Sequence, residues 1–282
     1  MTSLNEKTYL NISGYKFIPL THLADLKQEL LTYCNNHHLI GTILLSPEGI
    51  NVTLAGTPTE VHHFIDQLNA KPEFSDLTFK ESFSETVPFS RMLVRLKKEI
   101  IAFGVKSIDP AKKTSPHLPA ETLKEWLDAG KEVLLLDTRN DYEVRVGTFK
   151  GAEHIDLKTF RAFPKRCKEL LETHKDKPVV TFCTGGVRCE KAAPLMEEVG
   201  FEEVYQLDGG ILTYFEKCGN AHWEGDCFVF DKRVAIAPTL EETFMKQCYA
   251  CRQPLSDDEV KSPLYEETKS CPYCYERTKS SH

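Results

Sequence analysis

The amino-acid sequence predicts two sheet-based domains, one α+β and one α/β, followed by a small cysteine-rich tail. Three observations support this fold class. Residues 15–96 alternate short apolar runs with amphipathic stretches. Residues 133–207 contain three continuous apolar runs separated by helical stretches, which is typical of a parallel sheet buried on both faces. Four of the ten cysteines lie beyond residue 247, in two Cys-x2-Cys pairs.

The N-terminal domain, with a basic linker at its end, is expected to cover residues 1–114. The segment Ser46-Pro-Glu-Gly49 favours a tight turn that joins two strands in a hairpin. The resulting order, β-α-β-β-α-β, is that of a ferredoxin-like fold, and no group of residues in it indicates catalysis. We expect strands at 15–20, 39–45, 50–54, 77–83 and 92–96, and helices at 23–37 and after a possible N-cap at Thr57 or Thr59.

The central domain is expected to cover residues 115–222. Ligands in doubly wound sheets bind beyond the carboxyl ends of the strands, and this rule points to the residues that follow Phe182. The βαβα order that predicts such a parallel sheet consists of strands at 133–137, 179–182 and 204–207 and helices at 120–129, 159–173 and 189–199.

Composition and charge exclude several classes of protein. With 41% hydrophobic and 27% charged residues the chain is an ordinary globular one, without a signal-peptide pattern or an apolar run of about 18 residues. We therefore expect a cytoplasmic protein that makes no membrane contact. The net charge of −7 does not indicate a nucleic-acid binder. Residues 86–113, however, carry seven basic and two acidic residues, so this segment is either an electrostatic footprint for a polyanion or a solvated linker.

The loop after Phe182 carries the strongest sign of chemistry. A thiol at the end of a strand, in a glycine-containing loop and at the positive end of a helix, is expected to have a low pKa and to be a thiolate near neutral pH. The loop arginine adds a fixed positive charge, and this arrangement suits a nucleophilic cysteine. Cys189 is either a resolving thiol or a small residue that packs the first helical turn. The candidate catalytic residues are Cys183, Arg188 and Cys189, and the rest of the active-site loop is Thr184, Gly185, Gly186 and Val187.

Several segments between residues 136 and 211 resemble, in order, the signatures of the rhodanese family. The resemblance implies that Cys183 is the cysteine that carries a persulfide in that family. Related phosphatases have a loop one residue longer, so the six-residue loop disfavours phosphatase activity. Asp137, Arg139 and Glu143 are expected to be scaffold for the loop rather than chemical groups. The matching segments are Leu136-Asp-Thr-Arg139, Glu143, Gly151-Ala-Glu-His-Ile155, Cys183–Arg188 and Leu207-Asp-Gly-Gly-Ile211.

A narrower resemblance covers nearly the whole chain. The order of a ferredoxin-like domain, a rhodanese-type domain with Cys-Thr-Gly-Gly-Val-Arg-Cys-Glu-Lys at 183–191, the segment Trp223–Asp231 and a cysteine-rich tail is similar to that of bacterial rhodanese-like tRNA uridine hydroxylases. This resemblance implies that the wobble uridine (position 34), in the anticodon region of tRNA, is converted to 5-hydroxyuridine with oxygen as co-substrate. Basic residues would grip the tRNA, and the candidates are Arg91, Arg95, Lys97 and Lys98.

The means of oxygen activation is not visible in the sequence, which has no flavin or NAD fingerprint and no convincing iron site. The remaining hypothesis is a cysteine-centred mechanism, with Cys183 as a thiolate, persulfide or oxidised sulfur. Two other functions stay open on the sequence: a persulfide-forming sulfurtransferase, and a non-enzymatic regulator that binds a partner through its tail. The sequence does not predict the oligomeric state.

The tail is expected to cover residues 223–282. Its cysteines have the spacing of a tetrahedral zinc site, and so small a tail is hard to fold without one. The alternative is a flexible tail with unliganded thiols or disulfides. Trp223, Phe228 and Phe230 stand at its start, and we interpret them as packing for the tail in preference to a substrate wall. The four candidate metal ligands are Cys248, Cys251, Cys271 and Cys274.

Overall fold

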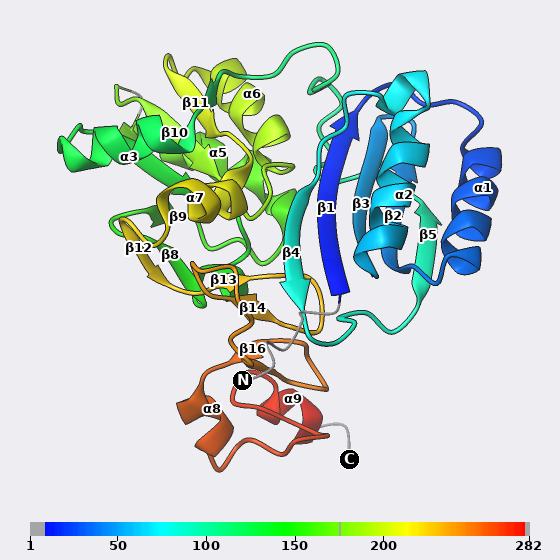
Figure 1. Ribbon diagram of the computed structural model, residues 1–282. Helices are drawn as coiled ribbons and strands as arrows, with labels where there is room; N and C mark the ends of the chain where they lie inside the picture. Colours follow the sequence, from blue (N-terminus) through cyan, green and yellow to red (C-terminus); the bar gives the residue numbers. More distant parts are fainter. Residues whose placement is uncertain (1–8, 175, 280–282) are drawn as a thin grey trace, which may run out of the picture.

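The computed structural model describes residues 9–174 and 176–279, which form two sheet-based domains side by side and a small tail at one end (Figure 1). The predicted fold class is confirmed. The predicted domain limits at residues 114 and 222 fall in connecting segments, just before the strands that begin at His117 and Trp223, and stay predictions. In the described part of the chain, no helix has both the length and the apolar character needed to cross a membrane.

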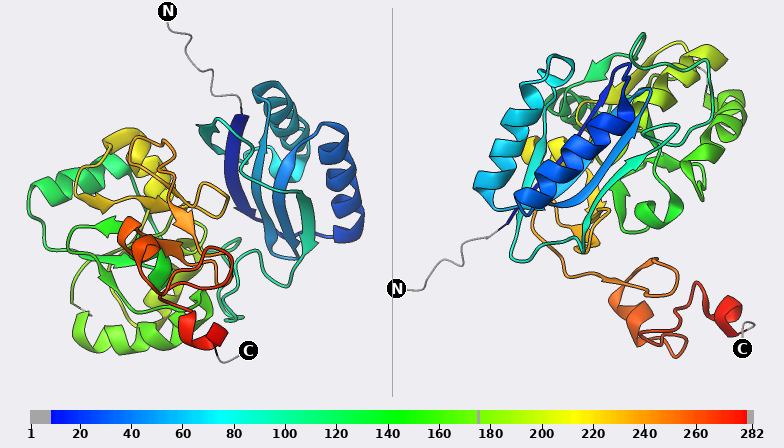
Figure 2. Two further views of the ribbon diagram at one scale, coloured as in Figure 1. Left: turned by 90° about the horizontal axis from the view of Figure 1, so that it is seen from below. Right: turned by 90° about the vertical axis from the view of Figure 1, so that its right-hand side faces the viewer.

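The N-terminal domain contains a five-stranded sheet in the order β4-β1-β3-β2-β5. Neighbouring strands are antiparallel, except that the edge strand β5 is parallel to β2. Both helices cover one face of the sheet, and the other face turns toward the second domain (Figure 2). The elements are β1 (Tyr9–Phe17), α1 (Leu23–Asn36), β2 (Ile40–Ser46), β3 (Gly49–Gly56), α2 (Pro58–Asn69), the 3-10 turn η1 (Pro72–Phe74), β4 (Lys80–Ser84) and β5 (Met92–Leu96).

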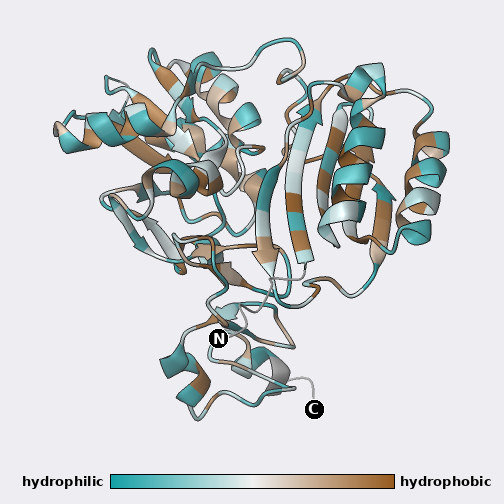
Figure 3. Cartoon of the chain, viewed as in Figure 1, coloured by the Kyte–Doolittle hydropathy of each residue, from teal (hydrophilic) through white to brown (hydrophobic). Residues whose placement is uncertain are grey.

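The alternation of side chains explains this arrangement. Along β1, Leu10 and Ile12 are buried in the core under the helices, whereas Ser13 and Tyr15 are only partly buried. Helices α1 and α2 mix hydrophilic and hydrophobic residues, as amphipathic helices do (Figure 3). Thr57 is the N-cap of α2, as predicted, and its side chain accepts a hydrogen bond from the Glu60 amide. The first strand begins at residue 9 and not at 15, so that part of the prediction was wrong.

The central domain contains a five-stranded sheet in the order β6-β11-β10-β7-β9, and every neighbouring pair is parallel. Apolar strand residues are buried on both faces of the sheet, so the predicted doubly wound architecture is confirmed. The elements are β6 (His117–Leu118), α3 (Ala120–Asp128), β7 (Leu134–Asp137), α4 (Asp141–Val144), β8 (Gly147–Phe149), β9 (Glu153–His154), η2 (Phe160–Ala162), α5 (Phe163–His174), β10 (Val179–Phe182), α6 (Cys189–Val199), β11 (Val204–Leu207) and α7 (Gly210–Cys218).

The last part of the chain returns to both domains before it forms the tail. Strand β12 pairs with β8 of the central domain. Arg233, between β13 and β14, pairs with Asp231 and donates to the Ser82 hydroxyl of the N-terminal sheet at 2.8 Å. The segment therefore ties the two domains together. Its elements are β12 (Trp223–Gly225), β13 (Cys227–Phe228), β14 (Ala235–Ile236), β15 (Lys246–Gln247), β16 (Pro254–Leu255), α8 (Asp257–Lys261) and α9 (Tyr275–Lys279).

Candidate active site

Cys183 directly follows β10, and its loop leads into α6. The Gly186 amide donates a hydrogen bond to the Cys183 sulfur at 3.2 Å. Gly186 has a φ of +99°, a conformation that side-chain-bearing residues rarely adopt. Glycine at this position therefore lets the backbone N–H turn toward the sulfur.

The start of α7 anchors the other side of the loop. The Cys183 and Thr184 carbonyl oxygens accept hydrogen bonds from the Ile211 and Leu212 amides, at 3.0 and 3.1 Å. A Cβ atom on Gly210 would lie 2.5 Å from the Cys183 carbonyl oxygen, and Gly210 has a φ of +68°. The Gly-Gly pair at 209–210 thus lets two chain segments approach closely. Because the loop carbonyl groups accept hydrogen bonds from the start of α7, the amides of the loop remain available to face the Cys183 sulfur.

The electrostatics of the site favour a thiolate at Cys183. Burial by itself would raise the pKa of this thiol. A hydrogen bond from Cys189, the Arg188 charge and the amides of Arg188 and Gly186 act in the opposite direction, and together they lower the pKa of Cys183 to about 5. Burial and the neighbouring Cys183 raise the pKa of Cys189 well above its usual value. Cys189 is therefore a neutral thiol that donates to the Cys183 thiolate.

The predicted scaffold residues form two ion pairs behind the loop. Glu143 binds the Arg188 guanidinium with both carboxylate oxygens, at 2.5 and 2.8 Å, and both side chains are buried. Asp137 and Arg139 pair at 2.6 Å with no exposed side-chain surface. The bidentate contact with Glu143 fixes the Arg188 head group beside Cys183.

A cavity of about 390 Å³ lies between the loop and the open face of the N-terminal sheet. Cys183, Thr184 and Val187 contribute to its floor, and Phe89, Phe160 and Phe230 add aromatic surface. The Tyr15 hydroxyl donates to a Glu190 carboxylate oxygen at 3.1 Å, so the sheet contacts the first turn of α6, directly after the loop. The sheet contributes Ser13 and Tyr15 from β1, Thr42 and Leu44 from β2, and Asn51 and Thr53 from β3.

The four tail cysteines also come together. One sulfur atom from each of Cys248, Cys251, Cys271 and Cys274 lies within 4.8 Å of all the others. Individual sulfur–sulfur distances are 3.9 Å for 248–274, 3.5 Å for 251–271 and 3.7 Å for 271–274. Four sulfurs placed about 2.3 Å from a central ion would be about 3.8 Å apart, so this cluster can hold a tetrahedral metal ion.

Comparison with known proteins agrees with both domains. Residues 9–100 match the family described as UPF0176 acylphosphatase like domain, and residues 119–217 match the rhodanese-like domain family. The chain is 49% identical to a tRNA uridine(34) hydroxylase of Cupriavidus necator, over 94% of this chain and 96% of that protein. A protein of the same name from Acaryochloris marina is 46% identical, over 95% of this chain and 86% of that protein. This chain belongs to the tRNA uridine(34) hydroxylase family.

Solved rhodanese-like structures match a smaller part of this chain than the tRNA uridine(34) hydroxylases do. The rhodanese-like domain of an Anabaena protein is 22% identical with a TM-score of 0.33, covering 39% of this chain and 80% of that domain. A human single-domain sulfurtransferase is 23% identical with a TM-score of 0.30, covering 36% of this chain and 97% of that protein.

The structure separates the predicted site residues of this hydroxylase-family chain into three places. Cys183, Arg188, Cys189 and Glu143 lie together at the loop, and the four tail cysteines form their own cluster. The predicted RNA contacts, Arg91, Arg95, Lys97 and Lys98, lie on or beside β5; all four are exposed, and none lines the cavity at Cys183.

Among the residues that line this cavity without having been assigned to the site from the sequence are Tyr15, Lys80 and Phe230. Period-two alternation along β1 is a signal that places Tyr15 on the open face. Trp223, Phe228 and Phe230 were all interpreted as packing residues. Trp223 and Phe228 are buried, as that interpretation requires. Phe230 differs, because it is 59% exposed and forms part of the cavity wall.

Proposed function

We propose that this protein hydroxylates uridine 34 of tRNA at C5 of the base, with Cys183 as its catalytic residue and molecular oxygen as co-substrate. The observation that carries the proposal is identity of 46 to 49% with tRNA uridine(34) hydroxylases over at least 94% of the chain. The site supports it, because a thiolate faces a cavity at the carboxyl end of a parallel sheet.

Five residues in or beside the loop have a role in this proposal. Cys183 is the nucleophilic sulfur, and Arg188 and the Gly186 amide stabilise its negative charge. Cys189 donates a hydrogen bond to that sulfur. Glu143 holds Arg188 in place. The replacement of C5–H by C5–OH is a two-electron oxidation, which we assign to a reaction centred on Cys183 with oxygen as the oxidant. One atom of O2 enters the base, and the other leaves as water with two protons and two electrons from an external reductant.

The exposed basic residues near β5 are the proposed contact for the tRNA backbone. Arg91, Arg95, Lys97 and Lys98 make no ion pair within the described residues, whereas Lys112 and Lys113 of the same segment pair with Asp109 and Glu197. Unpaired basic side chains release counterions when they bind phosphates. We expect a triple variant, with Arg95, Lys97 and Lys98 changed to alanine, to bind tRNA more weakly and to show a smaller dependence of its affinity on salt concentration. A double variant, with Lys112 and Lys113 changed to alanine, should have a smaller effect. Equal effects would contradict this assignment.

Nucleoside mass spectrometry of tRNA tests the function. Cells lacking the gene are complemented with the wild type, Cys183→Ala, Cys189→Ser or Cys167→Ala; the last is a matched control, because Cys167 is equally buried but lies on α5. We expect the wild type and Cys167→Ala to restore 5-hydroxyuridine and Cys183→Ala to restore none.

Two results would contradict the proposal. If 5-hydroxyuridine and its derivatives were unchanged on deletion, while purified protein carried a stable persulfide, the protein would be a sulfurtransferase. If Cys183→Ala kept full activity while Cys189→Ser lost it, the roles of the two cysteines would be wrong.

A further inference from the structure

Phe230 is an exposed aromatic ring in the wall of the Cys183 cavity. It is 59% exposed, although the aromatic residues that precede it, Trp223 and Phe228, are buried. Phe228 supports it edge-to-face at 5.1 Å between ring centroids, and the Arg188 guanidinium lies 5.8 Å from its centroid. Phe230 therefore has defined neighbours while more than half of its surface stays exposed, as a stacking platform for a flat ligand requires.

Lys80 is a cation in the same wall without an acidic partner. It begins β4, is mostly buried, and forms no ion pair within 4.0 Å in the part of the chain that the structure describes. Buried charges are normally paired, so a lone ammonium in a cavity is suited to bind an acceptor on a ligand. Burial lowers the pKa of Lys80, while the negative charges of Cys183, Asp208 and Glu216 act to raise it.

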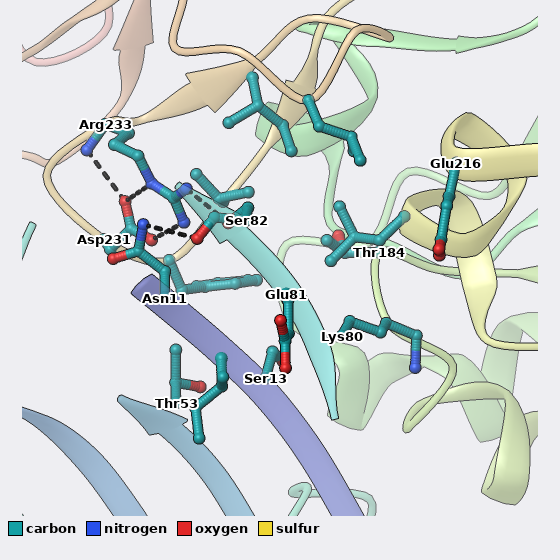
Figure 4. A pocket seen from close by; sticks show the side chains of 16 residues that line it. Asn11, Ser13, Thr53, Lys80, Glu81, Ser82, Thr184, Glu216, Asp231 and Arg233 are labelled. Carbon is teal, nitrogen blue, oxygen red and sulfur yellow. Dashed lines mark hydrogen bonds and ion pairs between the residues drawn. The ribbon is translucent and has the colours of Figure 1, made fainter. Parts of the chain in front are cut away.

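The two residues frame one continuous space. Lys80, Thr184 and Phe230 line both the Cys183 cavity and a second hollow beside it. Figure 4 shows this second hollow and labels Lys80, on β4, and Thr184 among the residues that line it. A ligand in this shared space can therefore contact the phenyl ring of Phe230 and the ammonium group of Lys80.

From these contacts we propose that the uracil base of the substrate nucleotide enters this cavity, stacks on Phe230 and accepts a hydrogen bond at its C4 carbonyl oxygen from Lys80. The inference rests on the proposed function. Bases of single-stranded RNA loops can be splayed out and stacked on aromatic side chains, and a cavity of about 390 Å³ has the usual size of a small-ligand site. Cytosine carries an amino donor where uracil carries this carbonyl, so a lysine, which is only a donor, selects uracil.

The test uses the full-length protein and an anticodon stem-loop RNA with uridine at position 34. We expect Phe230→Ala to lower kcat/KM at least about tenfold, mainly through KM, and Phe230→Tyr to restore most of it. The matched control is Phe244→Ala, because Phe244 is 77% exposed but does not line the cavity, and it should leave kcat/KM unchanged.

Lys80→Met provides a specificity readout that a purely structural role would not change. We expect it to lower kcat/KM about tenfold and to reduce the preference for the uridine stem-loop over a cytidine stem-loop used as a competitor, while Lys80→Arg retains that preference. Unchanged melting temperatures show that the variants fold. If wild type is active and both Phe230→Ala and Lys80→Met keep its kcat/KM and preference, the inference is overturned and the proposed function stands. An inactive wild type would overturn the proposed function itself.

Discussion

Four buried cysteines of this protein differ sharply in the pKa of their sulfur atoms. Burial raises the pKa of Cys34, Cys167 and Cys227 to about 12, whereas the pKa of Cys183 falls to about 5. All four side chains are fully buried, so burial is not the difference. Cys183 alone among these four has loop amides, the Cys189 thiol and the Arg188 charge directed at its sulfur.

The first prediction concerns the titration of Cys183. Because its pKa is lowered, the thiolate exists above the pKa and is lost as the pH falls through about 5. Arg188→Gln removes an adjacent positive charge and should raise the pH of half-titration by about 1 to 3 pH units. The pH of half-titration is measured by following the ultraviolet absorbance of the thiolate against pH and subtracting that of the Cys183→Ser variant. Arg166→Gln, which removes an exposed arginine on α5, is the control and should change nothing. Half-titration of the wild type above pH 8 would show that the loop amides, Cys189 and Arg188 do not stabilise a Cys183 thiolate.

The second prediction concerns Gly210. Gly210→Ala places a Cβ 2.5 Å from the Cys183 carbonyl oxygen at a φ of +68°, so it combines backbone strain with a clash. Gly130 has nearly the same φ, +66°, with open space around it, and Gly130→Ala should therefore cost about 1 kcal/mol of unfolding free energy. We expect Gly210→Ala to cost at least about 2 kcal/mol in urea denaturation and to reduce hydroxylation. Equal costs for the two variants would show that the loop does not depend on this close approach.

At the scale of elements, strands that are buried on both faces of a sheet were the ones that the sequence predicted best. Strands β10 and β11 lie where they were expected, because continuous apolar runs mark strands inside a parallel sheet. Strand β1 begins six residues early because its first part mixes core and polar residues: Asn11 is buried and donates to the Ser84 hydroxyl at 3.0 Å, a partner 73 positions away. Such a contact leaves no local pattern.

The same reasoning applies to the candidate site. The loop from Cys183 to Arg188 was predictable because its groups are consecutive in sequence. Tyr15, Lys80 and Phe230 come from three distant strands or connections and meet only when the domains pack together. Single residues at such separations have no spacing to recognise, so the sequence indicated the floor of the cavity and not its walls.

The tail packs against the element that carries Glu143. Just after α4, the Arg145 guanidinium lies 4.1 Å from the Tyr273 ring centroid and donates to the Gln253 side chain at 2.7 Å. Both partners stand next to the cysteine cluster in sequence. The tail therefore contacts the residue that follows α4 through two side chains that lie close in sequence to the cysteine cluster.

The third prediction concerns the metal of this cluster, which we propose to be zinc. Purified protein should contain one zinc ion per chain by elemental mass spectrometry, and Cys251→Ser or Cys274→Ser should lose most of it. Cys218→Ser is the control, because Cys218 lies on α7, outside the cluster, and it should retain the metal. We expect zinc loss to lower the melting temperature and to expose the tail to proteolysis. Metal-free protein with an equally protected tail would contradict this prediction.

At the scale of the whole molecule, the first turn of α6 joins the two domains. Glu190 accepts hydrogen bonds from the Tyr15 hydroxyl on β1 and from Thr114 in the interdomain linker. The Lys191 ammonium, whose side chain is 2% exposed, contacts Glu48 at 2.8 Å and Glu99 at 3.0 Å. These two residues follow Cys189 directly. The segment that follows the Cys183 loop thus also holds the N-terminal sheet in place as the opposite wall of the cavity.

The last prediction tests this connection. Lys191→Met leaves the Glu48 and Glu99 carboxylates without their shared cation, and we expect it to lower the unfolding free energy by about 3 kcal/mol. Lys124→Met is the matched control, because Lys124 pairs with Asp128 on an exposed helix surface and should cost less than about 1 kcal/mol. In Lys191→Met, hydroxylation of tRNA should fall strongly while the thiolate titration of Cys183 changes little, because the groups that lower its pKa most, Arg188, Cys189 and the Gly186 amide, lie within the central domain. If hydroxylation persisted in a destabilised Lys191→Met protein, a fixed N-terminal wall would not be needed for the reaction. If the titration shifted as well, the loop itself would depend on the docked sheet.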